Sequence, residues 1–216
     1  MSNQATLLAR IRAALADAAH APAASRAFRE CMPPGGETPE AQLALFSTQA
    51  AALRADVRIM PSVEAFRAFI VAEGWQRIAS HRSPLTETAL AGHDALWTDE
   101  GYDRSALEQC EVGITGCDAL IAQTGGVLVT ARSGGGRGLS VLVPHHIVLA
   151  RPEQLVPDLS AAFALLESRY GATLPSSISF ITGPSRTGDI ERILVLGAHG
   201  PARLTILLLN GDWASG

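Results

Sequence analysis

Arg203-Leu-Thr-Ile-Leu-Leu-Leu209 is an apolar run with the length of a β-strand, and its residues do not alternate between apolar and polar. A second run of this kind covers residues 146–150. Strands that are apolar on both faces are typical of parallel sheets covered by helices on both sides. The chain is therefore expected to be an α/β protein with a mainly parallel sheet.

The rest of the chain repeats this pattern of short apolar runs separated by helical segments. A helix is expected to begin at Thr38, which can cap it, with Pro39 at its first position. The β-rich middle of the chain predicts an antiparallel excursion or an edge hairpin. Strands are expected at residues 57–60, 76–79, 95–98, 112–115, 119–123, 127–130, 139–143, 146–150, 178–182 and 203–209, and helices at 38–54, 62–72, 157–169 and 187–194.

The first fifty residues differ from the remainder. Residues 20–38 are rich in proline and glycine and predict a linker or an extended arm. We expect an N-terminal helical extension with a Pro-rich arm over residues 1–50 and one α/β domain over residues 51–216. An amphipathic helix over residues 4–19 is expected from the helical spacing of Leu7, Leu8, Ile11 and Leu15.

All 17 basic residues of the chain are arginines, and lysine is absent. This composition excludes Schiff-base catalysis, a lysine general base and a phosphate-binding lysine of the Walker type. Any anion must therefore be bound by arginine, histidine or backbone N–H groups. The formal net charge of −4 and the scattering of the arginines argue against a nucleic-acid-binding protein.

The apolar stretches are too short for a membrane helix, which needs about 20 residues. The N-terminus lacks the compact apolar stretch of a signal peptide, so a cytoplasmic protein is expected. Cys31, Cys110 and Cys117 have neither CxxC nor CxxxC spacing. An iron–sulfur cluster or a cysteine zinc site is therefore not expected in this chain.

Glycine-rich loops flank several of the expected strands, and ligands of open α/β sheets bind beyond the carboxyl ends of strands. The loop Thr182-Gly-Pro-Ser-Arg-Thr187 is the sharpest of them. Gly183 turns the chain after a strand, and Ser185 or Thr187 can cap the expected helix. The N–H groups at the helix start and the guanidinium of Arg186 would together bind a carboxylate or a phosphate. Helix capping alone is the alternative.

Two further turns, Thr115-Gly-Cys-Asp118 and Thr124-Gly125, present hydroxyl and N–H groups beside a short strand. Asp118 is a candidate general acid or base, or else the cap of its turn. The loop Ser133-Gly-Gly-Gly-Arg-Gly-Leu-Ser140 is not a dinucleotide fingerprint, because it lacks the GxGxxG spacing and no helix is expected after it. Its Arg137 is either a mobile clamp over a ligand or a solvated hairpin tip. The candidate ligand-binding residues of these loops are Thr115, Thr124, Gly125, Arg137 and Ser140.

Three of the six histidines lie in the two loops Pro144-His-His146 and Gly197-Ala-His-Gly-Pro201. His146 and His199 are candidate catalytic residues, because imidazole exchanges protons near neutral pH. A substrate contact and a purely structural role are both open. No metal site is expected, because the adjacent His145 and His146 point in opposite directions on an extended chain.

Together these motifs resemble the lactate-utilisation protein C family, also called the LUD domain. The resemblance covers about residues 50–210. It implies a three-layer α/β/α sandwich similar to the CoA-transferase and sugar-phosphate-isomerase folds. It also implies partner subunits, one of them rich in iron–sulfur clusters, with which L-lactate is oxidised to pyruvate. The stretches that carry the resemblance are residues 114–126, 136–140, 144–146, 180–191 and 196–201.

One position departs from the family pattern. Many relatives have Ala-Glu-Thr-Gly where this chain has Ala-Gln123-Thr-Gly. In CoA transferases of this fold a glutamate in a comparable loop is the nucleophile, and glutamine cannot replace it. CoA-transferase chemistry is therefore not expected.

The resemblance implies that this chain is a clusterless subunit of an L-lactate oxidation system. It would carry no cofactor, and the iron–sulfur clusters would lie in a partner. Arg186 would hold the carboxylate, Arg137 would close over it, and His146 or His199 would take the hydroxyl proton. A non-catalytic scaffold that docks its partner through the N-terminal helix is one alternative, and a stand-alone enzyme acting on sugar phosphates or acyl-CoA is another.

Overall fold

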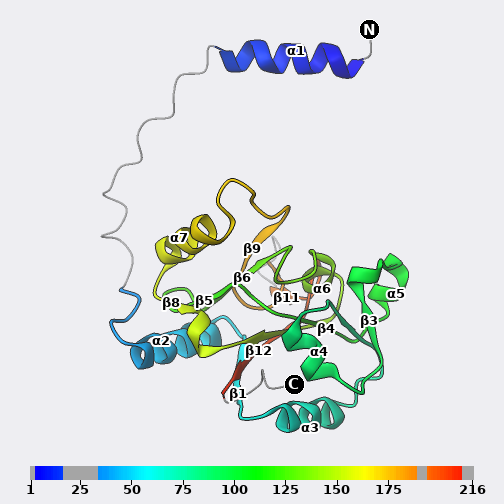
Figure 1. Cartoon of the computed structure of the whole chain (residues 1–216), viewed down its shortest axis with the longest axis vertical. Helices are drawn as coiled ribbons and strands as arrows, with labels where there is room; N and C mark the ends of the chain where they lie inside the picture. The colour runs from blue at the N-terminus through cyan, green and yellow to red at the C-terminus, as the bar shows by residue number, and fades with distance from the viewer. Residues whose placement is uncertain (1–2, 17–33, 189–193, 211–216) are drawn as a thin grey trace. The chain divides into compact units, whose positions relative to one another are not determined.

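The computed structural model describes residues 3–16, 34–188 and 194–210, which fall into two separate units (Figure 1). The described part of the first unit is one helix, α1 (Asn3–Ala16), which agrees with the expected N-terminal helix. Most of the expected Pro-rich arm and Cys31 lie outside the described residues. Among the described residues, no helix is both long and apolar enough to cross a membrane.

The second unit is built on a six-stranded sheet in which every pair of neighbouring strands is parallel. The prediction of a mainly parallel sheet is confirmed. The apolar run quoted first is a central strand, buried along nearly its whole length. In order across the sheet, the strands are β1 (Asp56–Met60), β12 (Arg203–Leu209), β7 (His145–Ala150), β4 (Val112–Thr115), β2 (Ile78–Ser80) and β3 (Ala95–Trp97).

Helices cover both faces of this sheet, which confirms the expected three layers. On one face, α3 (Val63–Glu73) and α4 (Pro84–Leu90) pack Phe66 and Leu90 against Ile147 of β7. On the other face, α2 (Pro39–Ala52) packs Phe46 against Ile206 of β12. Two short helices, α5 (Arg104–Glu108) and α6 (Gly138–Val141), cover the same face near β2.

A second, four-stranded sheet lies against the α2 face and is the expected antiparallel excursion. Its strands β5 and β6 form an antiparallel hairpin, and the helix α7 (Leu159–Tyr170) packs on its outer face. In Figure 1 the layers of this α/β unit run from α3 on its lower side, through β12 and the second sheet, to α7 on its upper side. The strand order is β8 (Leu155–Val156), β5 (Ala119–Ile121), β6 (Gly126–Thr130) and β9 (Ile178–Ile181).

The compact α/β unit begins at Pro34, whereas the sequence placed its start at residue 51. Helix α2 causes this difference, because Phe46 and Ala50 are fully buried in the core between the two sheets. The boundary expected from composition missed this packing, since α2 follows a Pro- and Gly-rich stretch.

Two local predictions were wrong. Residues 186–188 form β10 (Arg186–Gly188), which pairs antiparallel with β11 (Leu194–Leu196), where a helix was expected from residue 187. Residues 138–141 form helix α6 where a strand was expected at 139–143. The run Leu-Ser-Val-Leu-Val has no clear period, and only tertiary packing decides its structure. The remaining short elements are the 3₁₀-helices η2 (Thr98–Glu100) and η3 (Pro152–Gln154).

Candidate functional site

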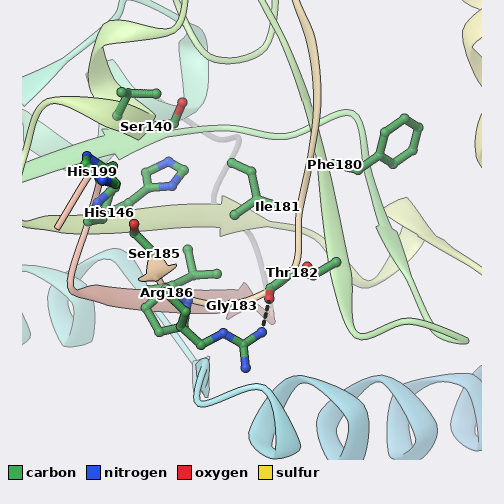
Figure 2. Close-up of a pocket in the computed structure, with 14 residues that line it drawn as sticks. Ser140, His146, Phe180, Ile181, Thr182, Gly183, Ser185, Arg186 and His199 are labelled. Carbon is green, nitrogen blue, oxygen red and sulfur yellow. Dashed lines mark hydrogen bonds between the residues drawn. The ribbon is translucent and has the colours of Figure 1, made fainter. Parts of the chain in front are cut away.

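A cavity of about 400 Å³ lies at the amino ends of β7 and β12 and at the carboxyl end of β9. The sequence placed a ligand site at the carboxyl ends of strands. The cavity agrees with this expectation at β9 but not at β7 and β12. Figure 2 shows the side chains around it, with His146 and His199 at one end and the Arg186 guanidinium toward the other. The lining residues are Ser140, Val141, His146, Phe180, Ile181, Thr182, Gly183, Pro184, Ser185, Arg186, His199, Gly200, Pro201 and Leu204.

Two loops on either side of the β10–β11 pair, residues 182–186 and 197–201, form one wall of the cavity. The backbone N–H of Ser185 donates to the carbonyl of Pro201 over 2.8 Å, and the N–H of Gly197 donates to the carbonyl of Ser185 over 2.9 Å. A Cβ atom at Gly200 would lie 3.3 Å from the Cβ of Ser185. These contacts place the Ser185 hydroxyl beside the loop that carries His199.

Gly183 fixes the course of this wall. Its φ angle of +95° lies in the left-handed region, which side chains rarely adopt. A Cβ atom there would lie 2.4 Å from the carbonyl oxygen of Leu53, at the end of α2. The glycine therefore lets the loop approach the helix closely and turn back toward the cavity.

Arg186 supplies the positive charge of the cavity lining. Its side chain is exposed, and Nη2 donates to the carbonyl of Thr182 over 3.2 Å. None of the lining residues that the structure describes is acidic. Because β10 begins at Arg186, the expected helix start and its dipole do not contribute. The cavity thus suits a small anion through a guanidinium and hydroxyl groups.

His146 is almost completely buried in the wall, and its Nε2 lies 2.9 Å from Thr115 Oγ1. Burial, followed by the effect of neighbouring His145, lowers the pKa of His146 to about 3. The ring is therefore neutral at neutral pH. His199 lines the same cavity and is exposed to solvent.

His145 lies on the opposite face of the sheet, as expected for adjacent residues of a strand. Its Nε2 lies 2.8 Å from Thr205 Oγ1, and its ring packs edge-on against Trp75 with 5.3 Å between centroids. Burial is the largest cause that lowers its pKa, to about 4. Within the described ranges, no group of three or more His, Cys, Asp or Glu residues is placed to hold a metal ion.

Asp118 lies away from the cavity, in a buried network of its own. Its carboxylate accepts hydrogen bonds from the hydroxyls of Ser133 and Tyr170 and from Nη1 of Arg169, at 2.5, 2.6 and 2.7 Å. Burial alone would raise the pKa of Asp118, but these hydrogen bonds outweigh it and the pKa is lowered. The carboxylate thus joins the β4–β5 turn to the end of α7.

The other predicted ligand-binding residues lie outside the cavity lining. Thr115 is behind His146, and Thr187 is on β10. Thr124 accepts a hydrogen bond from the N–H of Gly126. Gly125 packs against α2, where a Cβ atom would lie 2.3 Å from the backbone nitrogen of Ala50.

Arg137 is exposed on the glycine loop and directly precedes α6. It does not line the cavity, although Ser140 of the same helix does. The loop does lead into a helix, contrary to expectation, but α6 has only four residues. The apolar part of the lining could not be found from residue type, because these side chains carry no chemical signal of their own. Its residues are Val141, Phe180, Ile181, Pro184, Pro201 and Leu204.

Comparison with known proteins gives the family of the chain. A family model of the LUD domain matches residues 79–209, which include every lining residue of the cavity. The chain belongs to the LUD domain family. The residues matched by the LUD model extend from β2 to β12, and the edge strand β1 lies outside them.

Curated relatives of the LUD chain include two proteins named lactate utilization protein C. That of Bacillus velezensis is 38% identical over 128 residues, 53% of this chain and 53% of the relative. That of Bacillus subtilis is 35% identical over 135 residues, 60% of this chain and 56% of the relative. The chain spans about half the length of these relatives.

A solved structure shares the fold of this LUD chain. The crystal structure of a DUF162 family protein from Deinococcus radiodurans superposes with a TM-score of 0.64 at 20% identity. The match covers 81% of this chain and 100% of the other. At this identity the likeness shows the fold alone.

Proposed function

We propose that this LUD chain is the clusterless subunit of an iron–sulfur-dependent system that oxidises L-lactate to pyruvate, and that it binds a small carboxylate in the cavity. The name of the relatives, lactate utilization protein C, supports the pathway. The observation that carries the binding site is a cavity lined, among the described residues, by one arginine and several hydroxyl groups but by no acidic side chain.

The dimensions and chemistry of the cavity support a small ligand with one carboxylate. The cavity volume of about 400 Å³ lies in the lower part of the range found for ligand pockets. A planar guanidinium binds a carboxylate through two parallel hydrogen bonds, and Arg186 is already oriented by its bond to the Thr182 carbonyl. The hydroxyls of Ser140 and Ser185 lie on the same cavity and can complete the polar contacts.

The two described cysteines support an assignment of the clusters to a partner. Cys110 and Cys117 are both buried, and burial raises the pKa of each thiol. A cluster ligand has to be a thiolate, which these surroundings disfavour. In this proposal the two electrons from lactate pass to the clusters of the partner subunit, His199 takes the hydroxyl proton, and the hydrogen on the Cα carbon leaves as a second proton to the solvent.

Calorimetric titration of the purified full chain tests the proposal. We expect L-lactate and pyruvate to bind, and inorganic phosphate and acetyl-CoA to bind at least tenfold more weakly. Arg186→Ala should lower the carboxylate affinity by 10- to 100-fold, because a charged hydrogen bond contributes about 1.5–3 kcal/mol. Arg132→Ala is the matched control, since Arg132 is exposed and does not line the cavity. Equal affinity in wild type and Arg186→Ala would contradict the assigned site.

A second function is favoured by the surface of α1. Leu7, Leu8 and Ile11 are exposed on this helix. A role in docking an iron–sulfur partner would give these apolar residues a buried environment. Deletion of residues 1–33 should then abolish co-purification of the partner and leave the melting temperature of the α/β unit unchanged. Unchanged co-purification would contradict this role.

A further inference from the structure

The two edges of the six-stranded sheet differ in length and exposure. β3, at one edge, has three residues, and the Arg82 guanidinium lies over the ring of Trp97, 4.6 Å from its centroid. β1, at the other edge, has five residues, and its Ile59 is 61% exposed. Short edge strands prevent edge-to-edge association, whereas a longer one with an exposed apolar side chain favours it. Among the described residues, no strand pairs with the outer side of β1.

The backbone groups on the outer side of β1 belong to Val57 and Ile59. Alternate residues of a strand direct their N–H and C=O groups to the same side. The N–H of Asn210, which follows β12, donates to the carbonyl of Met60 over 3.0 Å, so the backbone groups of Met60 face β12. Arg58 shares this orientation, and Val57 and Ile59 have the opposite one. Their N–H and C=O groups therefore point away from β12, where another strand can bind them.

β1 also carries one acidic and one basic side chain on the same face. The carboxylate of Asp56 and the guanidinium of Arg58 are 2.6 Å apart, and both side chains are nearly half exposed, at 45% and 43%. The Arg58 guanidinium lies over the ring of Phe69, 5.2 Å from its centroid, which places it on the α3 face. The strand thus presents charges of both signs beside its free edge.

These charges distinguish the ways in which two copies of β1 can pair antiparallel. With Arg58 opposite Arg58 of the second copy, like charges meet, which is unfavourable. A pairing centred on Ile59 brings no opposite charges together. With Val57 opposite Val57 of the second copy, the Asp56 of each copy lies opposite the Arg58 of the other. In this register the two valines also exchange both of their backbone hydrogen bonds.

We propose that the chain forms a homodimer through antiparallel pairing of β1 with β1 of a second copy, in the register centred on Val57. The two six-stranded sheets then form one continuous sheet. Ile59 lies beside Ala55 of the second copy, which covers part of its exposed apolar surface. The interface is independent of the proposed carboxylate site, because no residue of β1 is among the described residues that line the cavity.

Sedimentation velocity of the full chain tests the dimer. We expect the wild type to be dimeric at about 100 μM, as is reasonable for a small interface. Arg58→Asp and Asp56→Arg should each raise the dissociation constant of the dimer at least tenfold, because each places like charges opposite one another. Arg104→Asp is the matched control, since it reverses one charge of an exposed ion pair with Glu108 on α5. A monomeric wild type, or an Arg58→Asp dimer as tight as that of the wild type, would overturn the proposal.

A mixture of the two charge variants tests the register. In Asp56→Arg both charges of β1 are positive, and in Arg58→Asp both are negative. An equimolar mixture should therefore form a heterodimer, although neither variant dimerises alone. The double variant Asp56→Arg/Arg58→Asp should dimerise like the wild type. Absence of a heterodimer, with both variants folded by circular dichroism, would overturn the register centred on Val57.

Hydrogen exchange locates the contact within the dimer. The amides of Val57 and Ile59 should exchange at least tenfold more slowly in the wild type than in Arg58→Asp at the same concentration. Exchange of these two amides at equal rates in the dimeric wild type and the monomeric variant would place the contact elsewhere and overturn the proposal.

Discussion

Asp118 and His146 are both almost completely buried, and the sequence presents both as catalytic candidates, yet they have different surroundings. Asp118 accepts three hydrogen bonds from side chains and does not line the cavity. His146 has one paired nitrogen and one without a described partner, and it lines the cavity. Burial and a shifted pKa are common to both residues. Of the two residues, His146 is therefore the candidate for contact with a ligand, because it alone lines the cavity.

The largest expected effect of a single substitution is the loss of stability in Asp118→Asn. This substitution replaces a buried carboxylate that accepts three hydrogen bonds. Weakening these charged hydrogen bonds costs about 3 kcal/mol of the free energy of unfolding, although the Arg169 side chain is itself 44% exposed. Urea denaturation measures the loss, and titration should show unchanged carboxylate affinity. Glu108→Gln is the control, because its ion pair with Arg104 is exposed and contributes about 0.5 kcal/mol. If the folded Asp118→Asn variant lost carboxylate binding, Asp118 would act on the binding site, and the contrast between Asp118 and His146 would be wrong.

The pH dependence of stability should come from His145 and His146 before it comes from Asp118. In the folded state the two pKa values are lowered to about 4 and about 3, so the unfolded chain takes up protons first as the pH falls below 6.5. Stability should therefore be complete above pH 6.5. Below it, the loss should be about 1.4 kcal/mol per pH unit for each histidine. The lowered pKa of Asp118 adds its own loss only below 3.8.

Urea denaturation at pH 7, 6 and 5 checks this dependence. His145→Gln and His146→Gln should each remove about one proton from the uptake on unfolding. Only the second should change carboxylate affinity. A stability that stays constant between pH 7 and pH 5 would contradict the prediction.

A smaller effect is expected from Tyr170→Phe. The substitution removes one of the donors to Asp118 and leaves the ring packing in place, which costs about 1 kcal/mol. The melting temperature should fall by a few degrees, while ligand affinity stays the same. A loss as large as that of Asp118→Asn would contradict the expectation that each donor to Asp118 contributes its own share of the stability.

The smallest effect on stability is expected from Ser185→Ala. The Ser185 side chain lines the cavity, so its removal should change the free energy of unfolding by less than about 0.5 kcal/mol. Pyruvate affinity should fall about fivefold, the contribution of one neutral hydrogen bond. Titration and denaturation of the same sample measure both quantities. The reverse pattern, with stability lost and affinity kept, would assign Ser185 to the structural group.

The sequence predicted the sheet well because its central strands are buried on both faces and carry their signal locally. Burial of all six residues of β7 is visible as a continuous apolar run. The structures of residues 138–141 and 186–188 were mispredicted, because α6 packs against residues distant in sequence, such as Ala79 and Leu107, and β10 pairs with β11 although Ser185 and Thr187 resemble helix caps. Local capping signals are weaker than such tertiary contacts.

The same limit applies to the site. His146, His199, Ser140 and the loop from Thr182 to Arg186 were all singled out by residue type, and they do line one cavity. The partners of Asp118 could not be found in this way. Arg169 and Tyr170 lie 51 and 52 positions further along the chain, and nothing in their local sequence indicates the contact.

The position of β12 has a consequence for how the protein is made. This strand lies between β1 and β7, so residues 203–209 complete the middle of the sheet and not its edge. Until these residues leave the ribosome, β1 has no neighbouring strand to pair with. The edges of β1 and β7 that later pair with β12 stay without hydrogen-bond partners. Pairing between strands this far apart in sequence is slow. A nascent chain that stops short of residue 203 should therefore be a substrate for chaperones and not a folded intermediate.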